Sequence, residues 1–125
     1  MEFVFYARQT NHQKEILLKK IIQITKQTPD LACDFDALFK IIKQKISEPV
    51  IIIFLISCAE ELDFLSANKA LLFNSRLIVI LPDEKESSIS KGFSLIPRYI
   101  AYMSHDFKDV SAVLKKMIQY YASRE

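Results

Sequence analysis

The stretch 50-VIIIFLI-56 is apolar at every position and is the longest strictly apolar run in the chain. A strand with one face in water would alternate apolar and polar residues, whereas a strand apolar throughout must have both faces covered. Such strands occupy the centre of parallel sheets that carry helices on each side. The run is far shorter than the roughly 20 residues that span a bilayer. It therefore predicts the central strand of an α/β domain and no membrane segment.

Other short apolar runs flank this stretch, and each is followed by a segment with helical periodicity. This alternation is typical of an α/β domain with a parallel sheet. The predicted strands are residues 3–7, 31–33, 50–56, 77–81 and 99–103. Five strand–helix pairs in 125 residues match the size of a flavodoxin-like doubly wound fold, whose usual strand order is 2-1-3-4-5. We therefore predict a single three-layer domain over residues 1–125.

Short polar side chains mark the starts of several predicted helices. The expected capping residues for the first, second and fourth helices are, respectively, Thr10 or Asn11, Asp34 or Asp36, and Ser87 or Ser88. The third helix is predicted over residues 59–74. It carries Glu60, Glu61 and Asp63 in its first turn, where the helix dipole favours acidic groups.

The composition excludes several functional classes. A single glycine, Gly92, is too few for the glycine-rich loops that hold phosphates or dinucleotides. Seventeen Lys and Arg residues against fifteen Asp and Glu residues give a net charge of +2, which argues against a dedicated nucleic-acid binder. No leader precedes Phe3, and two cysteines cannot form a disulfide framework, so we expect a cytoplasmic, reduced protein.

Three segments, taken in order, resemble the receiver domain of two-component response regulators (the CheY-like family). The segment 32-ACDFDALFKII-42 is similar to the receiver's second strand and second helix, and 48-EPVIIIFLIS-57 to its third strand, entered through a proline. The segment 101-AYMSHDFKDVSAVLKKMI-118 is similar to its fifth strand and fifth helix. The resemblance covers essentially the whole chain and implies the same fold.

The residues that perform the receiver's chemistry are absent at the matching positions. Receivers hold Mg²⁺ with two acidic residues after the first strand, where this chain has Ala7, Arg8 and Gln9. The phosphoacceptor aspartate at the end of the third strand corresponds to Leu55, within one residue of register. Phosphoryl transfer needs a nucleophilic carboxylate, a hard cation held by oxygen ligands and a cationic side chain. Leucine provides none of these.

Two further positions differ in the same way. The fourth strand ends in Leu81 and Pro82, where receivers have Thr or Ser, and the lysine of the fifth strand is replaced by His105. Ser104 remains as a hydroxyl. We therefore predict a pseudo-receiver, with no catalytic residue, metal or cofactor, that acts by binding a protein.

Polar residues at the carboxyl edge of the sheet leave a second hypothesis open. Ligands of doubly wound sheets bind at this edge, so a small-molecule binding domain or minor enzyme could use a polar rim there. The candidate rim residues are Arg8, Ser57, Cys58, Asp83, Ser104 and His105. Cys58 precedes a helix N-terminus, a setting that can activate a thiol, but buried cysteines are common and no Cys-x-x-Cys spacing supports this reading. Cys33 is expected to be a small core residue.

Aromatic residues and methionine gather at the fifth strand and last helix. Receivers dock and dimerise through the face made by helix four, strand five and helix five, so the resemblance implies a protein partner or a homodimer there. The candidate interface residues are Tyr99, Tyr102, Phe107, Met117 and Tyr121. Aromatic side chains are enriched in interfaces, but they are equally suited to the core. We interpret the helix lysines as solvated surface residues and not as a basic surface that binds nucleic acid.

Overall fold

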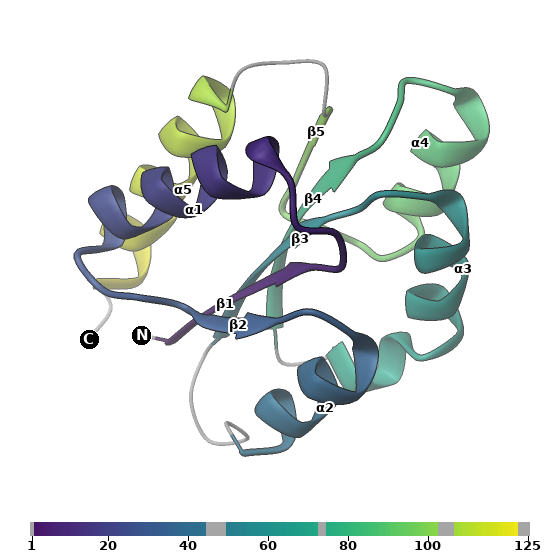
Figure 1. The fold of residues 1–125 in the computed structure, drawn as a ribbon, viewed down its shortest axis with the longest axis horizontal. Helices are drawn as coiled ribbons and strands as arrows, with labels where there is room; N and C mark the ends of the chain where they lie inside the picture. The colour runs from purple at the N-terminus through teal and green to yellow at the C-terminus, as the bar shows by residue number, and fades with distance from the viewer. Residues whose placement is uncertain (1, 45–49, 73–74, 103–106, 123–125) are drawn as a thin grey trace.

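The computed structural model describes residues 2–44, 50–72, 75–102 and 107–122 of the chain. It confirms the predicted α/β fold: five parallel strands form one sheet in the order β2-β1-β3-β4-β5, as in flavodoxin-like domains (Figure 1). The elements are β1 (Glu2–Ala7), α1 (His12–Thr25), β2 (Asp30–Ala32), α2 (Phe35–Gln44), β3 (Val50–Leu55), α3 (Ala59–Ala67), the 3-10 helix η1 (Lys69–Leu72), β4 (Ser75–Leu81), α4 (Glu86–Phe93), β5 (Tyr99–Tyr102) and α5 (Lys108–Ala122).

The β3 strand is buried along its whole length, as its apolar sequence predicts. Its side chains alternate between two separate cores, because successive residues of a strand point to opposite faces. Ile51, Ile53 and Leu55 join one core, while Ile52 and Phe54 join the other. The sheet therefore separates two hydrophobic layers, and β3 contributes to both.

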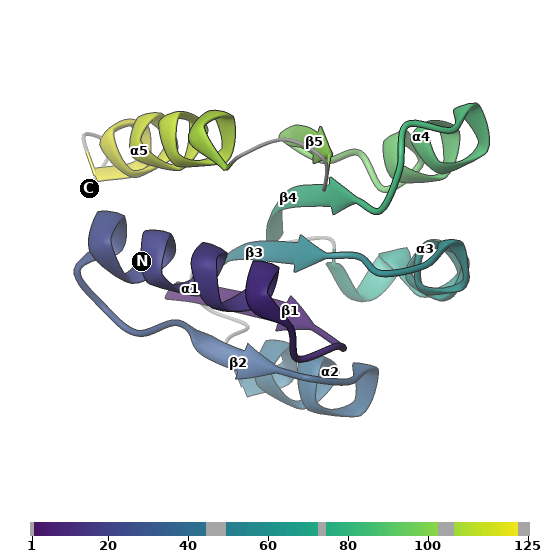
Figure 2. The ribbon, with the colours of Figure 1, turned by 45° about the horizontal axis from the view of Figure 1, so that its top comes forward.

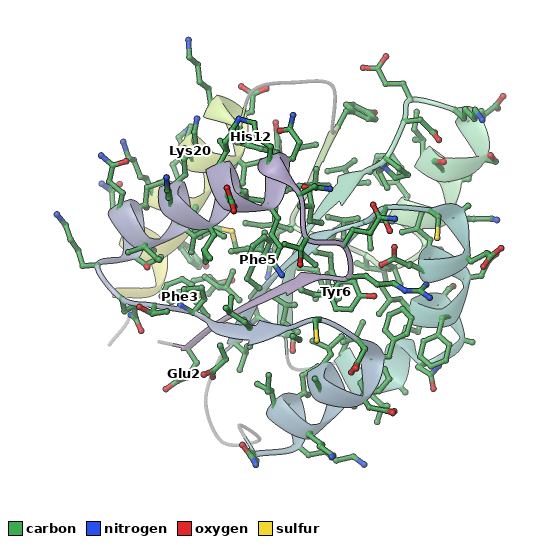
Figure 3. The ribbon with its side chains drawn as sticks, in the orientation of Figure 1. Glu2, Phe3, Phe5, Tyr6, His12 and Lys20 are labelled. Carbon is green, nitrogen blue, oxygen red and sulfur yellow. The ribbon has the colours of Figure 1, made fainter. Side chains whose placement is uncertain are left out.

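Helices cover the two faces unequally. The α1 and α5 helices lie on one face, where Leu17 and Leu114 are buried, and α2, α3 and α4 lie on the other (Figures 1 and 2). Figure 3 shows Phe3 and Phe5 on the α1 side of β1. Within the described segments, no helix combines the length and the apolar composition that crossing a membrane requires.

Two of the predicted helix caps are confirmed and one is wrong. Asn11 Oδ1 accepts the backbone N–H of Lys14 at 2.9 Å, and Asp34 Oδ1 accepts that of Ala37 at 2.8 Å. The α4 helix, however, begins after Lys85 and not after Ser87 or Ser88. Ser88 lies inside the helix and is buried.

The third predicted helix is shorter than expected. The α3 helix ends at Ala67, because Asn68 leaves helical geometry and its side-chain amide donates to the carbonyl of Phe64 at 2.9 Å. A separate 3-10 helix follows before β4. The predicted strand 31–33 is also displaced by one residue, and Cys33 beyond its end is exposed, so the expectation that Cys33 is a core residue is wrong.

Gly92 lets α4 lie close to β4. A Cβ atom built on Gly92 would be 3.1 Å from Leu81 Cδ2, which is tighter than ordinary van der Waals contact. A larger residue would require the Leu81 side chain to shift by a few tenths of an ångström. The lone glycine of the sequence therefore has a packing role.

Candidate functional site

The carboxyl ends of the neighbouring strands β1 and β3 lie side by side, and the connections that follow them run to opposite sides of the sheet. Ala7 is the register partner of Leu55. After β1 the chain continues to β2 on one side, and after β3 it continues to β4 on the other. Such a switch point is where open α/β sheets form a ligand crevice.

The positions that the sequence resemblance predicts to correspond to a receiver's phosphorylation site lie at this edge. Ala7, Leu55 and Leu81 are all buried, with Ala7 and Leu55 in the core under α1 and α5. Leu81 belongs to the opposite core, so it does not join them. Arg8 follows β1 and is exposed. The strand ends at these positions are therefore filled by apolar side chains.

Glu61 occupies an unexpected place. Its position in the first turn of α3 predicts a surface residue, but its side chain is only 1 % exposed. Glu61 Oε1 accepts the backbone N–H of Ser57 at 3.0 Å and also the Ser57 hydroxyl. The Cys58 Sγ atom lies 3.8 Å from the same oxygen. The Cys58 side chain caps nothing, so Glu61 ties the β3–α3 loop to the helix in its place.

Tyr6 lies near the end of β1 (Figure 3). The Glu61 carboxylate is close enough to act on its phenol. The Tyr6 ring stacks on Phe35 at a centroid distance of 5.2 Å, and Phe35 in turn stacks on Phe64 at 4.2 Å. Burial raises the pKa of the Tyr6 phenol well above its usual value, and the adjacent Glu61 carboxylate raises that pKa further. The phenol therefore remains protonated and can donate a hydrogen bond.

Two buried polar atoms at this site lack a hydrogen bond within the described part of the chain. They are the Tyr6 hydroxyl and Glu61 Oε2. The Glu61 carboxylate is the hydrogen-bonding group next to the Tyr6 phenol, so each is the nearest candidate partner of the other. Buried polar groups without partners are rare and call for an explanation.

Both residues line a surface pocket of about 490 Å³. Arg8 from the β1–α1 loop and Phe35 and Phe64 from the helices complete its walls. The remaining lining residues are acidic: Asp34, Asp36 and Glu60. Taken over residues 2–44, 50–72, 75–102 and 107–122, no three His, Cys, Asp or Glu side chains are arranged to hold a metal ion. Among its exposed lining residues, the pocket offers carboxylate oxygens and the Arg8 cation.

The predicted polar rim is partly brought together. Ser57 and Cys58 contact Glu61 directly, and Arg8 shares the pocket with Glu61. Asp83 lies in the β4–α4 loop, where its carboxylate accepts the backbone N–H of Lys85 at 2.9 Å, and it does not line this pocket. Ser104 and His105 lie outside the described residues.

Sequence reasoning did not select Tyr6 or Glu61. Tyr6 sits in an apolar strand and reads as a core residue. A signal for Glu61 was present, because a glutamate three residues after a helix N-cap is the position from which capping boxes form. Its neighbour Tyr6, however, comes from a distant part of the chain.

The predicted interface residues divide into two groups. Phe107 and Met117 are buried in the core, as the alternative reading of the sequence allowed. Tyr99 and Tyr102 are half-buried on β5. Tyr121 is half-buried on α5.

The Tyr121 hydroxyl accepts a 2.7 Å hydrogen bond from Arg76 Nε, whose guanidinium lies 5.6 Å from the tyrosine ring centroid. Two large apolar residues near β5 that the sequence analysis did not select are more exposed: the exposed fraction is 64 % for Phe93 and 82 % for Ile96.

A search against protein-family profiles found no match for this chain, and no curated protein sequence matches it.

Proposed function

We propose that this protein is a receiver-like module without phosphorylation chemistry, which works by binding a protein partner. The observation that carries the proposal is the apolar filling of the strand ends. Leu55 is buried at the tip of β3, beside Ala7 at the tip of β1. A phosphoacceptor at the tip of β3 needs a carboxylate that reaches solvent and a cation.

The surface around α4 and β5 supports the choice of a second copy of this chain as the partner. β5 is the terminal strand of the sheet, and α4 beside it leaves Phe93 largely in water. A two-fold dimer would cover this face on both subunits with the same residues. The net charge of +2 opposes self-association only weakly.

Treatment with acetyl phosphate and Mg²⁺, followed by intact-mass measurement, tests the lack of phosphorylation. We expect an unchanged mass, because no carboxylate occupies the strand tips at Ala7 and Leu55. An active receiver run in parallel confirms that the phosphodonor works. A stable single phosphate on an aspartate of this chain would refute the proposal.

Light scattering tests the partner. We expect twice the chain mass for the wild type and a shift toward monomer for Phe93→Asp and Tyr102→Arg. Leu31→Arg is the matched control, because Leu31 is an exposed apolar residue on β2, at the opposite edge of the sheet. A wild type that is monomeric at all concentrations, or equal disruption by the control, would contradict the dimer.

The Tyr6–Glu61 pocket favours a second candidate function, the binding of a small molecule at the carboxyl edge. The supporting observation is the place of the pocket at the switch point of the sheet, where it brings Arg8 together with the acidic residues Asp34, Asp36 and Glu60. Ligands that bind only the folded state raise the melting temperature. In a metabolite and nucleotide screen, a true hit should lose its effect in Arg8→Gln, because Arg8 lines the pocket. A screen without any shift would count against this function.

A further inference from the structure

A second pocket lies at the opposite, amino edge of the sheet. It is formed by η1, by the start of β4 and by the loop between α4 and β5, and its volume is about 580 Å³. This volume falls within the range of small-molecule sites. Three segments separated in sequence therefore enclose a space far from the Tyr6–Glu61 pocket.

The walls of this amino-edge pocket are mainly apolar. Leu72, Leu77 and Leu95 are buried core residues that also line it. The backbone N–H of Arg98 donates to the carbonyl of Leu77 at 2.7 Å, which fixes the α4–β5 loop against β4. The apolar surface is thus held in place by the sheet.

The charged residues that line the pocket are all cationic. They are Lys69, Arg76 and Arg98, and none of the described lining residues is acidic. Arg76 is engaged with Tyr121 on α5. Lys69 and Arg98 are exposed and form no ion pair with another described residue. Two cations beside an apolar cavity are complementary to an anion with an apolar body.

Ile96 stands at the mouth of the pocket in a costly conformation. Its φ angle is 52°, in the left-handed region that β-branched residues avoid, and Pro97 follows it. Its side chain is 82 % exposed. A ligand in the pocket would remove part of this apolar side chain from water.

We propose that the amino-edge pocket binds a small organic acid with an apolar body, independently of the function proposed above. The apolar body lies against Leu72, Leu77 and Leu95. The carboxylate is paired with Lys69 and Arg98.

Calorimetric titration with decanoate, below its micelle concentration, tests the proposal. Decylammonium is the matched probe, because it has the same tail and the opposite charge. We expect decanoate to bind and decylammonium to bind about tenfold more weakly or not at all. The double variant Lys69→Gln/Arg98→Gln should weaken decanoate binding about tenfold, while Lys40→Gln on α2 should leave it unchanged.

A blocking variant locates the site. Ala70 lines the pocket and is exposed, so Ala70→Trp fills the space without entering the core. We expect an unchanged melting temperature and loss of decanoate binding. Equal binding of both probes, retained binding in a folded Ala70→Trp variant, or no binding of decanoate would overturn the proposal. Binding of an acidic peptide without binding of decanoate would overturn it in favour of a protein partner.

Discussion

The carboxyl edge of the sheet is richer in acidic side chains and the amino edge in basic ones. Acidic side chains dominate the carboxyl edge, where the helices begin, and include Asp34, Asp36, Glu60, Glu61, Asp83 and Glu86. Cationic side chains gather at the amino edge and include Lys26, Lys69, Arg76 and Arg98. In a parallel α/β fold every helix dipole points the same way relative to the strands, so acids are favoured at one edge and bases at the other. The uneven distribution of charge therefore follows from the common direction of the helices relative to the strands.

The two edges differ more informatively in how they hold their polar groups. At the carboxyl edge, the carboxylate of Glu61 is buried and bonded to Ser57, and Tyr6 is buried beside it. At the amino edge, Lys69 and Arg98 remain in water next to an apolar pocket. We therefore expect stability to depend on single hydrogen-bonding groups at the carboxyl edge. At the amino edge we expect stability to depend on the backbone conformation of Ile96 and on ligand binding in the pocket.

The largest effect is expected at Glu61. Glu61→Ala removes the acceptor of Ser57 and leaves a cavity, so we expect a loss of about 2–4 kcal/mol in the free energy of unfolding. Glu61→Gln keeps an acceptor oxygen of similar shape and should lose about 1 kcal/mol or less. Urea denaturation measures both. Equal stability of the alanine variant and the wild type would show that the buried carboxylate does not hold the loop.

The next largest effect is a loss of folding stability at high pH, caused by Tyr6. The folded state raises the phenol pKa above its usual value of 10.0, so the unfolded chain ionises first as the pH rises. The wild type should therefore lose up to about 1.4 kcal/mol of stability per pH unit above pH 10 because of this group, whereas Tyr6→Phe should not. Urea midpoints at pH 7 and pH 11 measure the difference. Parallel pH profiles for the two proteins would contradict it.

A smaller effect of the opposite sign is expected at the amino edge. Ile96→Gly relieves the left-handed backbone conformation and removes a side chain that packs little, so we expect a gain of about 1 kcal/mol. Ile22→Gly is the control, because Ile22 is a partly exposed residue inside α1, and it should lose about 1 kcal/mol. Thermal unfolding compares them. A destabilised Ile96→Gly would mean that the side chain contributes more than its exposure suggests.

The smallest effect is expected at Asp83. Its pKa is lowered because the carboxylate accepts the backbone N–H of Lys85, with the Ser88 hydroxyl as a second donor. A lowered pKa stabilises the folded state above the usual value of 3.8, and this contribution is lost as the pH falls through the folded-state pKa. Asp83→Asn should therefore show a slightly smaller loss of stability between pH 7 and pH 3. A larger acid loss in the variant would contradict this sign.

Sequence patterns predicted those features that depend on neighbouring residues. The apolar run in β3 and the caps at Asn11 and Asp34 were identified correctly, because period and capping act over a few residues. The start of α4 was misplaced, since the helix begins after Lys85 and Ser88 lies buried inside it. The exposure of Cys33 was also missed, because it depends on where the short edge strand β2 ends.

The sequence by itself determined the strand–helix alternation, the central place of β3 and the absence of a carboxylate at Leu55, because each follows from local residue type and spacing. Only the tertiary structure decided that Glu61 is buried beside Tyr6 and that Leu95 and Leu72 share a pocket. These groups are brought together by parallel pairing and helix packing across long sequence separations, which no local pattern encodes.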